Sequence, residues 1–132
     1  MSEHISKRNV ISTDAAPAAI GPYSQAVQNS CLIFTSGQLP IDPKTGAFAG
    51  DSIEEQTRQS LENVKAVLQA ADLTLENILK TTVFLSDMNN FAGMNEVYAS
   101  FFSEGNFPAR SAVEVARLPK DALVEIEAIA AK

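Results

Sequence analysis

The chain has 132 residues, of which 45% are hydrophobic and 20% are charged, a composition typical of a globular domain and unlike that of a disordered chain. Its formal net charge of −6 comes from 16 acidic and 10 basic residues, and the basic residues are scattered along the chain. A chain of this length is expected to form a single domain over residues 1–132. The scattered basic residues exclude a broad basic surface, so nucleic acid is not an expected partner.

The N-terminal segment and the single cysteine bear on the cellular compartment, and the single histidine bears on metal binding. Residues 1–8 hold no apolar core segment, so we expect no secretory signal there, and no apolar run approaches transmembrane length. Cys31 is the only cysteine, which excludes an internal disulfide and fits a reducing compartment. His4 is the only histidine, so one chain cannot assemble a transition-metal site from the usual ligands. We expect a cytoplasmic protein without membrane association or a metal site.

Short strands and loops are predicted before the first helix. An apolar patch at Asn9–Ile11 suits an edge strand. Strand-like runs at Tyr23–Gln28 and Leu32–Ser36 are separated by an Asn-Ser pair, which is a hairpin signal. Residues 15–22 and 40–51 are rich in proline and glycine and are predicted to be loops.

Two helices flank a buried strand. Ser52 and Glu55 form a capping-box pattern that predicts a helix from about 53 to 71. The run Ile78–Leu85, rich in threonine, valine and phenylalanine, predicts a buried strand. Asn89 is the expected cap of a second helix, which Gly105 and Pro108 end. The side of this helix expected to pack carries Phe91, Met94, Tyr98, Phe101 and Phe102.

Two final strands, at 110–118 and 123–130, complete the order β-β-α-β-α-β-β. We therefore predict an α+β fold in which two helices pack on one face of a mainly antiparallel sheet. One face of the last strand is apolar and suits packing under the helices: Val124, Ile126 and Ala128. The other face mixes carboxylates with large apolar side chains: Leu123, Glu125, Glu127 and Ile129. Such a face is half-buried at best in a monomer, so we expect sheets from several subunits to meet there.

Arg110 is the first candidate for binding a substrate. It follows Phe-Pro-Ala, and the proline favours extended backbone, so Arg110 is expected at the start of a strand beside a loop. Its planar guanidinium can bind a carboxylate or a phosphate through two parallel hydrogen bonds. From pattern alone, a solvated arginine or an ordinary salt bridge is the commoner role.

Glu125 is the candidate acid or base. It lies between Val124 and Ile126, and partial desolvation by apolar neighbours would raise its pKa. The pattern equally allows a solvated glutamate, and it does not separate Glu125 from Glu127 and Glu114. We expect Glu125 on the strand that partners the strand of Arg110.

Four further residues are candidates for the lining of a pocket. Tyr23 could orient substrate or water through its hydroxyl, or simply pack its ring. Ser36 and Gly37 end a strand in a turn where glycine allows close backbone approach, so an amide there could bind an anion. Asn95 lies beside Met94 on the second helix, and a buried amide must be hydrogen-bonded to backbone or to ligand.

Two kinds of catalytic site are excluded by the sequence. The glycines at 46 and 50 lack the Lys-Ser/Thr of a phosphate-binding loop. No Ser-His or Cys-His pair is expected, because the only histidine is close to the N-terminus. An enzyme built from this sequence would use a carboxylate, a hydroxyl or bound water.

The sequence resembles the Rid (YjgF) family of reactive-intermediate enamine/imine deaminases, in its RidA-like subgroup, from about residue 9 to the end. The segments that carry the resemblance are Ala16–Gln25 (APAAIGPYSQ), Thr35–Pro40 (TSGQLP), Phe107–Ser111 (FPARS), Val115–Asp121 (VARLPKD) and Val124–Glu127 (VEIE). The resemblance implies a chorismate-mutase-like fold, a homotrimer with clefts between subunits, and hydrolysis of 2-imino acids such as 2-iminobutanoate and 2-iminopropanoate to 2-oxo acids and ammonia. It implies no cofactor.

The resemblance also implies roles for individual residues. Arg110 would bind the substrate carboxylate and Glu125 would orient or activate water, while Tyr23 completes the catalytic group. The substrate-binding residues would be Ser36, Gly37, Asn95 and Ala112. Members of the family usually carry cysteine where this chain has Ala112, so a thiol is absent there and the pocket would be wider by about one sulfur atom, which could shift the substrate range.

Two other functions remain open at this stage. The protein could bind a 2-oxo acid, or regulate a partner, without turnover. Endoribonuclease activity is a weaker alternative because the chain is acidic and has no basic stripe.

Overall fold

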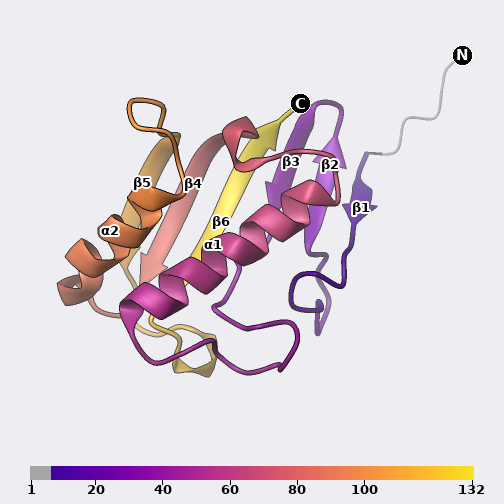
Figure 1. Ribbon diagram of the computed structural model, residues 1–132. Coiled ribbons are helices and arrows are strands. Elements are labelled where there is room, and N and C mark those ends of the chain that lie inside the picture. The colour runs from indigo at the N-terminus through magenta and orange to yellow at the C-terminus, as the bar shows by residue number, and fades with distance from the viewer. Residues whose placement is uncertain (1–6) are drawn as a thin grey trace, which may run out of the picture.

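The computed structural model describes residues 7–132, so the inferences drawn from His4 and from the first residues lie outside the described part. Figure 1 shows two helices in front of a single twisted sheet. The elements are β1 (Asn9–Ile11), β2 (Ala26–Asn29), β3 (Leu32–Thr35), α1 (Ile53–Gln69), β4 (Ile78–Leu85), α2 (Phe91–Ser100), β5 (Ala109–Glu114) and β6 (Val124–Ala131). Single 3-10 turns precede β4, α2 and β6. The α+β prediction is confirmed.

The sheet has six strands in the order β1-β2-β3-β6-β4-β5. Every pairing is antiparallel except that of β4 with β5, which is parallel. A parallel pair needs a crossover connection, and α2 supplies it between these two strands. The last strand of the chain, β6, is inserted between β3 and β4, so it lies in the middle of the sheet.

The first helix begins where the sequence predicts. Ser52 accepts a hydrogen bond from the Glu55 amide and the Glu55 side chain accepts one from the Ser52 amide, which completes the capping box. Such a cap stabilises a helix by about 1 kcal/mol. The buried side of α1 lies over β6 and β3 (Figure 1) and contributes Leu61, Val64, Val67 and Leu68, all 0% exposed.

The predicted cap of the second helix was wrong. Asn89 does not cap α2; instead its amide donates to Asp87, whose side chain caps a 3-10 turn at Met88–Asn90 that leads into the helix. Asn90 precedes α2 without a side-chain hydrogen bond. The packing side was predicted correctly, because Met94 and Tyr98 are buried and the three phenylalanines pack against the core.

Several strands are shorter than the pattern predicts, because a strand ends where its partner ends. β5 stops at Glu114 rather than at Leu118, since its only partner, β4, ends at Leu85. β2 starts at Ala26 rather than at Tyr23, since β1 pairs no further than Ala26. Tyr23 and Ser36 therefore lie in loops beside the sheet and not within it.

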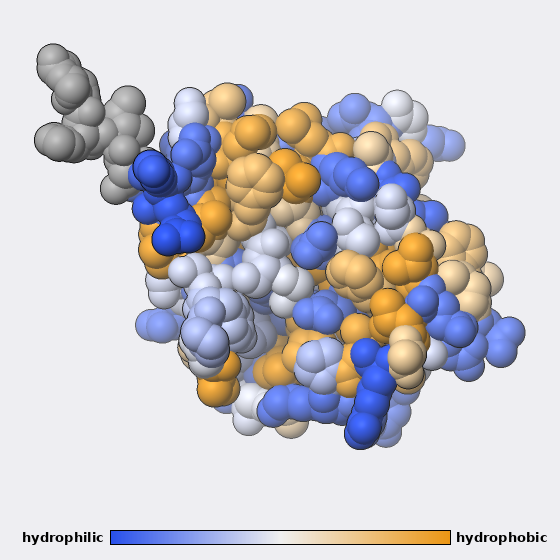
Figure 2. All heavy atoms as spheres, turned by 180° about the vertical axis from the view of Figure 1, so that it is seen from behind, coloured by the Kyte–Doolittle hydropathy of each residue, from blue (hydrophilic) through white to orange (hydrophobic). Residues whose placement is uncertain are grey.

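The face of the sheet turned away from the helices is not covered by any helix or strand among residues 7–132. Along β6 buried residues alternate with half-buried ones, as predicted. Large apolar side chains of other strands remain exposed on this face: Val10 on β1 is 65% exposed, Phe34 on β3 is 41% exposed and Val113 on β5 is 43% exposed. Figure 2 shows this face as apolar patches interrupted by polar side chains. Below we call it the open face.

Candidate functional site

Two separate hollows contain six of the seven residues singled out in the sequence. The Glu125 cavity, of about 700 Å³, contains Tyr23, Ser36, Gly37 and Glu125. The Arg110 hollow, of about 470 Å³, contains Asn95 and Arg110. Ala112 lines neither of them.

Glu125 lies directly against Gly37. The Gln38 amide donates to the Ile126 carbonyl at 2.7 Å, and the Ile126 amide donates back at 3.2 Å, so the turn is fastened beside β6. An ideal Cβ placed on Gly37 would lie 2.8 Å from the carboxyl carbon of Glu125, so no larger residue fits there without displacing that side chain. The close approach expected at Gly37 is therefore made by the protein's own carboxylate.

Burial raises the pKa of the Glu125 carboxyl above its ordinary value, and the negative charge of Glu127 raises this pKa further. Both carboxylates lie on the open face because they are two residues apart on β6. A carboxylate with a raised pKa is a better proton acceptor than an ordinary one, which is what a general base needs. Of the three glutamates that the sequence left open, Glu125 is the one that lines this cavity.

Glu114 has a structural contact instead. Its carboxylate accepts a hydrogen bond of 2.7 Å from the Met88 amide, where it ties the end of β5 to the turn before α2. Glu114 lines neither hollow.

Ser36 and Tyr23 lie on the wall of the Glu125 cavity. The Ser36 hydroxyl donates to the Ser24 carbonyl at 2.6 Å, so its oxygen can still accept a hydrogen bond from a ligand. Tyr23 is 52% exposed, and its hydroxyl accepts a hydrogen bond of 3.4 Å from the Ile20 amide. Two residues before it lies Gly21, whose φ of +124° favours glycine.

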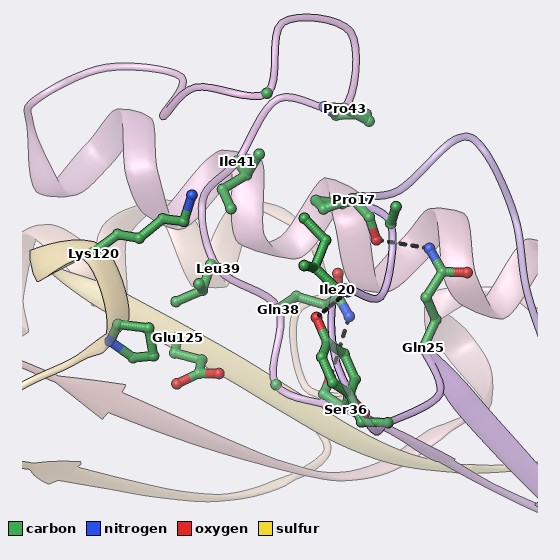
Figure 3. A pocket seen from close by; sticks show the side chains of 15 residues that line it. Pro17, Ile20, Gln25, Ser36, Gln38, Leu39, Ile41, Pro43, Lys120 and Glu125 are labelled. Carbon is green, nitrogen blue, oxygen red and sulfur yellow. Dashed lines mark hydrogen bonds between the residues drawn. The ribbon is translucent and has the colours of Figure 1, made fainter.

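Gln25 holds this wall together and was not among the candidates from the sequence. It is 4% exposed, and its side-chain oxygen accepts from the Thr13 amide at 2.7 Å. Its side-chain nitrogen donates to the carbonyls of Thr13 at 3.0 Å and Pro17 at 2.8 Å (the latter dashed in Figure 3). Gln25 belongs to the Tyr-Ser-Gln segment of the resemblance, which was the available signal.

Lys120 was also missed. It lines the Glu125 cavity from the side opposite Ile20 (Figure 3) and lies in the 3-10 turn at Pro119–Asp121 that precedes β6. Its φ of 57° is unusual for a residue with a side chain. Among the residues that line this cavity, Lys120 and Glu125 are the charged ones.

Arg110 lies on the helix side of the sheet, against α2. Its Nη1 donates to Oδ1 of Asn95 at 2.6 Å. Its guanidinium carbon lies 4.9 Å from the ring centre of Tyr98 and 5.5 Å from that of Phe91. The asparagine and the two aromatic rings occur at positions i, i+4 and i+7 of α2, which places them on one side of the helix. The hydrogen-bond partner left open for Asn95 is therefore Arg110.

Arg110 and Glu125 project from opposite faces of the sheet. Arg110 pairs with Thr81 on β4, and Thr81 is buried under the helices. Glu125 pairs with Phe84, three positions further along the same strand, so it lies on the other face. The expectation that Glu125 lies on the strand next to Arg110 was wrong, because β4 is inserted between β5 and β6. Ala112 shares the face of Arg110 and packs against the core.

Neither a metal site nor a membrane span is found in the part of the chain that the structure describes. Among residues 7–132 no three histidine, cysteine, aspartate or glutamate side chains gather into a potential metal cluster. No helix in the same range combines the length and the apolar character needed to cross a bilayer.

Comparison with known proteins gives a consistent result. The model of a family described as Endoribonuclease L-PSP matches residues 13–132. A protein of Salmonella typhimurium named 2-iminobutanoate/2-iminopropanoate deaminase is 60% identical over 124 residues, which cover 92% of this chain and 96% of the relative.

Solved structures agree with the sequence comparison. Escherichia coli TdcF with bound serine has a TM-score of 0.90 and 52% identity, and the match covers 94% of this chain and 98% of that one. The YjgF gene product of Escherichia coli has a TM-score of 0.89 and 56% identity, with 94% and 98% covered.

Proposed function

We propose that this chain, which belongs to the family described as Endoribonuclease L-PSP, the YjgF/Rid family, is an enzyme. It hydrolyses 2-imino acids and their enamine tautomers. The products are 2-oxo acids and ammonia, and the simplest substrates are 2-iminobutanoate and 2-iminopropanoate. The observation that carries the proposal is the 60% identity to the Salmonella deaminase over 92% of the chain. The resemblance found in the sequence is thereby confirmed.

Arg110 is the proposed clamp for the substrate carboxylate. A guanidinium has five N–H donors, and the bond to Asn95 uses one of them, so the others remain for a carboxylate. A bidentate, charge-assisted pair of this kind fixes both the position and the orientation of the ligand. The bound serine of the TdcF structure is also a small carboxylate, which supports this ligand class.

Glu125 is the proposed proton carrier. In the reaction, water attacks C2 of the imine and loses one proton, the C=N electrons move to nitrogen, and nitrogen takes up a proton to give a carbinolamine. The C–N bond then breaks as C=O forms, the hydroxyl proton passes to nitrogen, and ammonia leaves. One carboxylate of raised pKa can accept each proton from oxygen and deliver it to nitrogen. An imine is already electrophilic, so holding the carboxylate beside a placed water provides most of the required help.

Tyr23, Ser36 and Gly37 are proposed to complete the water and substrate side of the site. The Ser36 oxygen keeps an acceptor position, and the Tyr23 hydroxyl lies on the same wall of the Glu125 cavity. Gly37 leaves room for the Glu125 carboxylate.

The assembly proposed to unite the two hollows is a homotrimer. A substrate cannot contact Arg110 and Glu125 of one chain together, because they project from opposite faces of the sheet. A neighbouring subunit can place its Arg110 hollow against the Glu125 cavity, and the exposed apolar side chains of the open face provide surface for that contact. Three copies close such a head-to-tail contact into a ring.

Ala112 is proposed to keep a backbone role. It packs against the core two residues after Arg110, on the same face of β5. Its methyl group leaves more room than a cysteine would, so it bears on substrate range rather than on the chemical step.

A coupled assay tests the proposal. A pyridoxal-phosphate threonine dehydratase generates the imine, and formation of 2-oxobutanoate is followed with and without this protein. We expect acceleration over buffer with no added metal or cofactor. Unchanged rates, together with stoichiometric binding of 2-oxobutanoate, would instead support a binding or regulatory protein.

A further inference from the structure

We infer that Tyr98 is a positioning residue of the site: anchored on Thr81, its ring sets the plane in which Arg110 presents its guanidinium to a carboxylate. The inference concerns a residue that the sequence identifies only as packing, and it rests on the proposed function for its link to turnover. The geometry of α2, β4 and β5 carries it.

Tyr98 is held in place through both its hydroxyl and its ring. It is 3% exposed, and its hydroxyl forms a buried hydrogen bond of 2.6 Å with the hydroxyl of Thr81. The Phe102 ring packs on it with a centroid separation of 5.0 Å. A buried ring with an anchored hydroxyl has little freedom to rotate or shift, so its face is a rigid surface.

That rigid surface is where Arg110 lies. The guanidinium carbon is 4.9 Å from the ring centre, within the range of an attractive cation–π contact. Thr81, the anchor of the hydroxyl, is also the register partner of Arg110 on β4. One residue of β4 therefore locates both the base of the arginine side chain and the ring beneath its tip.

The charges around Tyr98 agree with this arrangement. Burial raises the pKa of the Tyr98 hydroxyl, while the hydrogen bond to Thr81 and the positive charge of Arg110 act in the opposite direction. The hydroxyl stays neutral at physiological pH and is held by Thr81, so it serves as an anchor for the ring.

Asn95 alone cannot set the plane of the guanidinium. It provides a single hydrogen bond, about which the group can still swing. The ring of Tyr98 below and the ring of Phe91, at 5.5 Å, restrict that swing. Loss of the Tyr98 ring should therefore weaken carboxylate binding while leaving proton transfer at Glu125 intact.

The test is the effect of Tyr98→Leu and Tyr98→Phe on the full-length protein. For Tyr98→Leu we expect KM to rise about tenfold, the equivalent of a lost cation–π contact and orientation, with kcat changed less than about twofold. Tyr98→Phe keeps the ring and should raise KM less. Val97→Ala is the matched control, since Val97 is the neighbouring buried residue of α2 and should lower the melting temperature without changing KM.

A double-mutant cycle separates positioning from general destabilisation. In an Arg110→Met background, Tyr98→Leu should produce no further change in affinity, because the ring acts through the guanidinium. Additive effects would overturn the inference, as would an unchanged KM in Tyr98→Leu. If Tyr98→Leu does not fold, the rotation of the Arg110 guanidinium is measured instead from its ¹⁵N signals in Tyr98→Phe. A rotation rate equal to that in the parent protein would then count against the inference.

Binding of 2-oxobutanoate, measured by calorimetry, keeps the two proposals distinguishable. A weaker Kd in Tyr98→Leu supports the positioning role even if the protein shows no turnover. Normal turnover in the parent with an unchanged Kd in Tyr98→Leu would reject the positioning role alone.

Discussion

Arg110 and Glu125 lie on opposite faces of one sheet, separated by the single strand β4. The separation follows from register, because their partners Thr81 and Phe84 are an odd number of residues apart on that strand. A site that uses both side chains must therefore draw them from two copies of the chain. Five predictions rest on the arrangement of these residues.

Mixed assemblies should recover activity from two inactive variants. Arg110→Met and Glu125→Gln are each expected to abolish most of the deaminase activity. When both chains are co-expressed in equal amounts, about a quarter of the clefts between subunits should receive an intact Arg110 from one chain and an intact Glu125 from the other. The measurement is the coupled assay on purified mixed assemblies, with each variant alone as the control. Activity no higher than that of the variants alone would contradict a site shared between two chains.

Arg110→Met should weaken binding of the carboxylate more than it slows the chemical step. Loss of a buried, charge-assisted pair costs about 2–5 kcal/mol, so kcat/KM should fall at least about thirtyfold, and Arg110→Lys should recover part of it. Arg58→Met is the matched control, because Arg58 also lies over an aromatic ring, that of Phe101 at 6.0 Å, but lines neither hollow. Equal losses in the two variants would remove Arg110 from the site.

Glu125→Gln should lower activity and raise stability at neutral pH. The pKa of Glu125 is raised by burial in the folded chain, so the folded state holds this proton more tightly than the unfolded state. Stability then falls as pH rises from the ordinary pKa through the raised one, and the ionised form is the destabilised form. Thermal unfolding should show Glu125→Gln melting above the parent at pH 7 and equal to it at pH values below the ordinary pKa of glutamate. A melting temperature of Glu125→Gln below that of the parent at pH 7 would contradict burial as the cause of the raised pKa.

Glu127→Gln provides the companion test, since it removes the second cause of the raised pKa. The acidic limb of the pH dependence of kcat/KM should move to lower pH in this variant. An unmoved limb would show that another group controls it.

Gly37→Ala should disable the site through the side chain of Glu125. The added Cβ would lie 2.8 Å from the Glu125 carboxyl carbon, so the carboxylate must move. We expect a loss of kcat of about tenfold or more, because small displacements of a catalytic group are costly. The control compares the change in melting temperature caused by Gly37→Ala in the parent protein and in a Glu125→Ala background. In the Glu125→Ala background the melting temperature should not fall, because the obstructing atoms belong to the side chain that was removed. A fall of equal size in both backgrounds would indicate backbone strain instead.

The sequence by itself determined the elements and the faces. The capping box at Ser52 and the period of apolar residues specify α1, because these signals are local and depend on neighbouring side chains. The alternation along β6 specified which side of that strand is buried, since side chains alternate strictly in extended backbone. Residue type and local context made Arg110 and Glu125 candidates, and the family resemblance implied their roles.

Only the tertiary structure decided how those candidates relate. The parallel pairing of β5 with β4, and the insertion of β6 between β3 and β4, depend on long-range contacts that no local pattern encodes. They place Arg110 against Tyr98 and Asn95 on the helix side, and Glu125 against Gly37 on the open face. The lengths of β2 and β5 were also set in this way, because a strand persists only while a partner can satisfy its backbone hydrogen bonds.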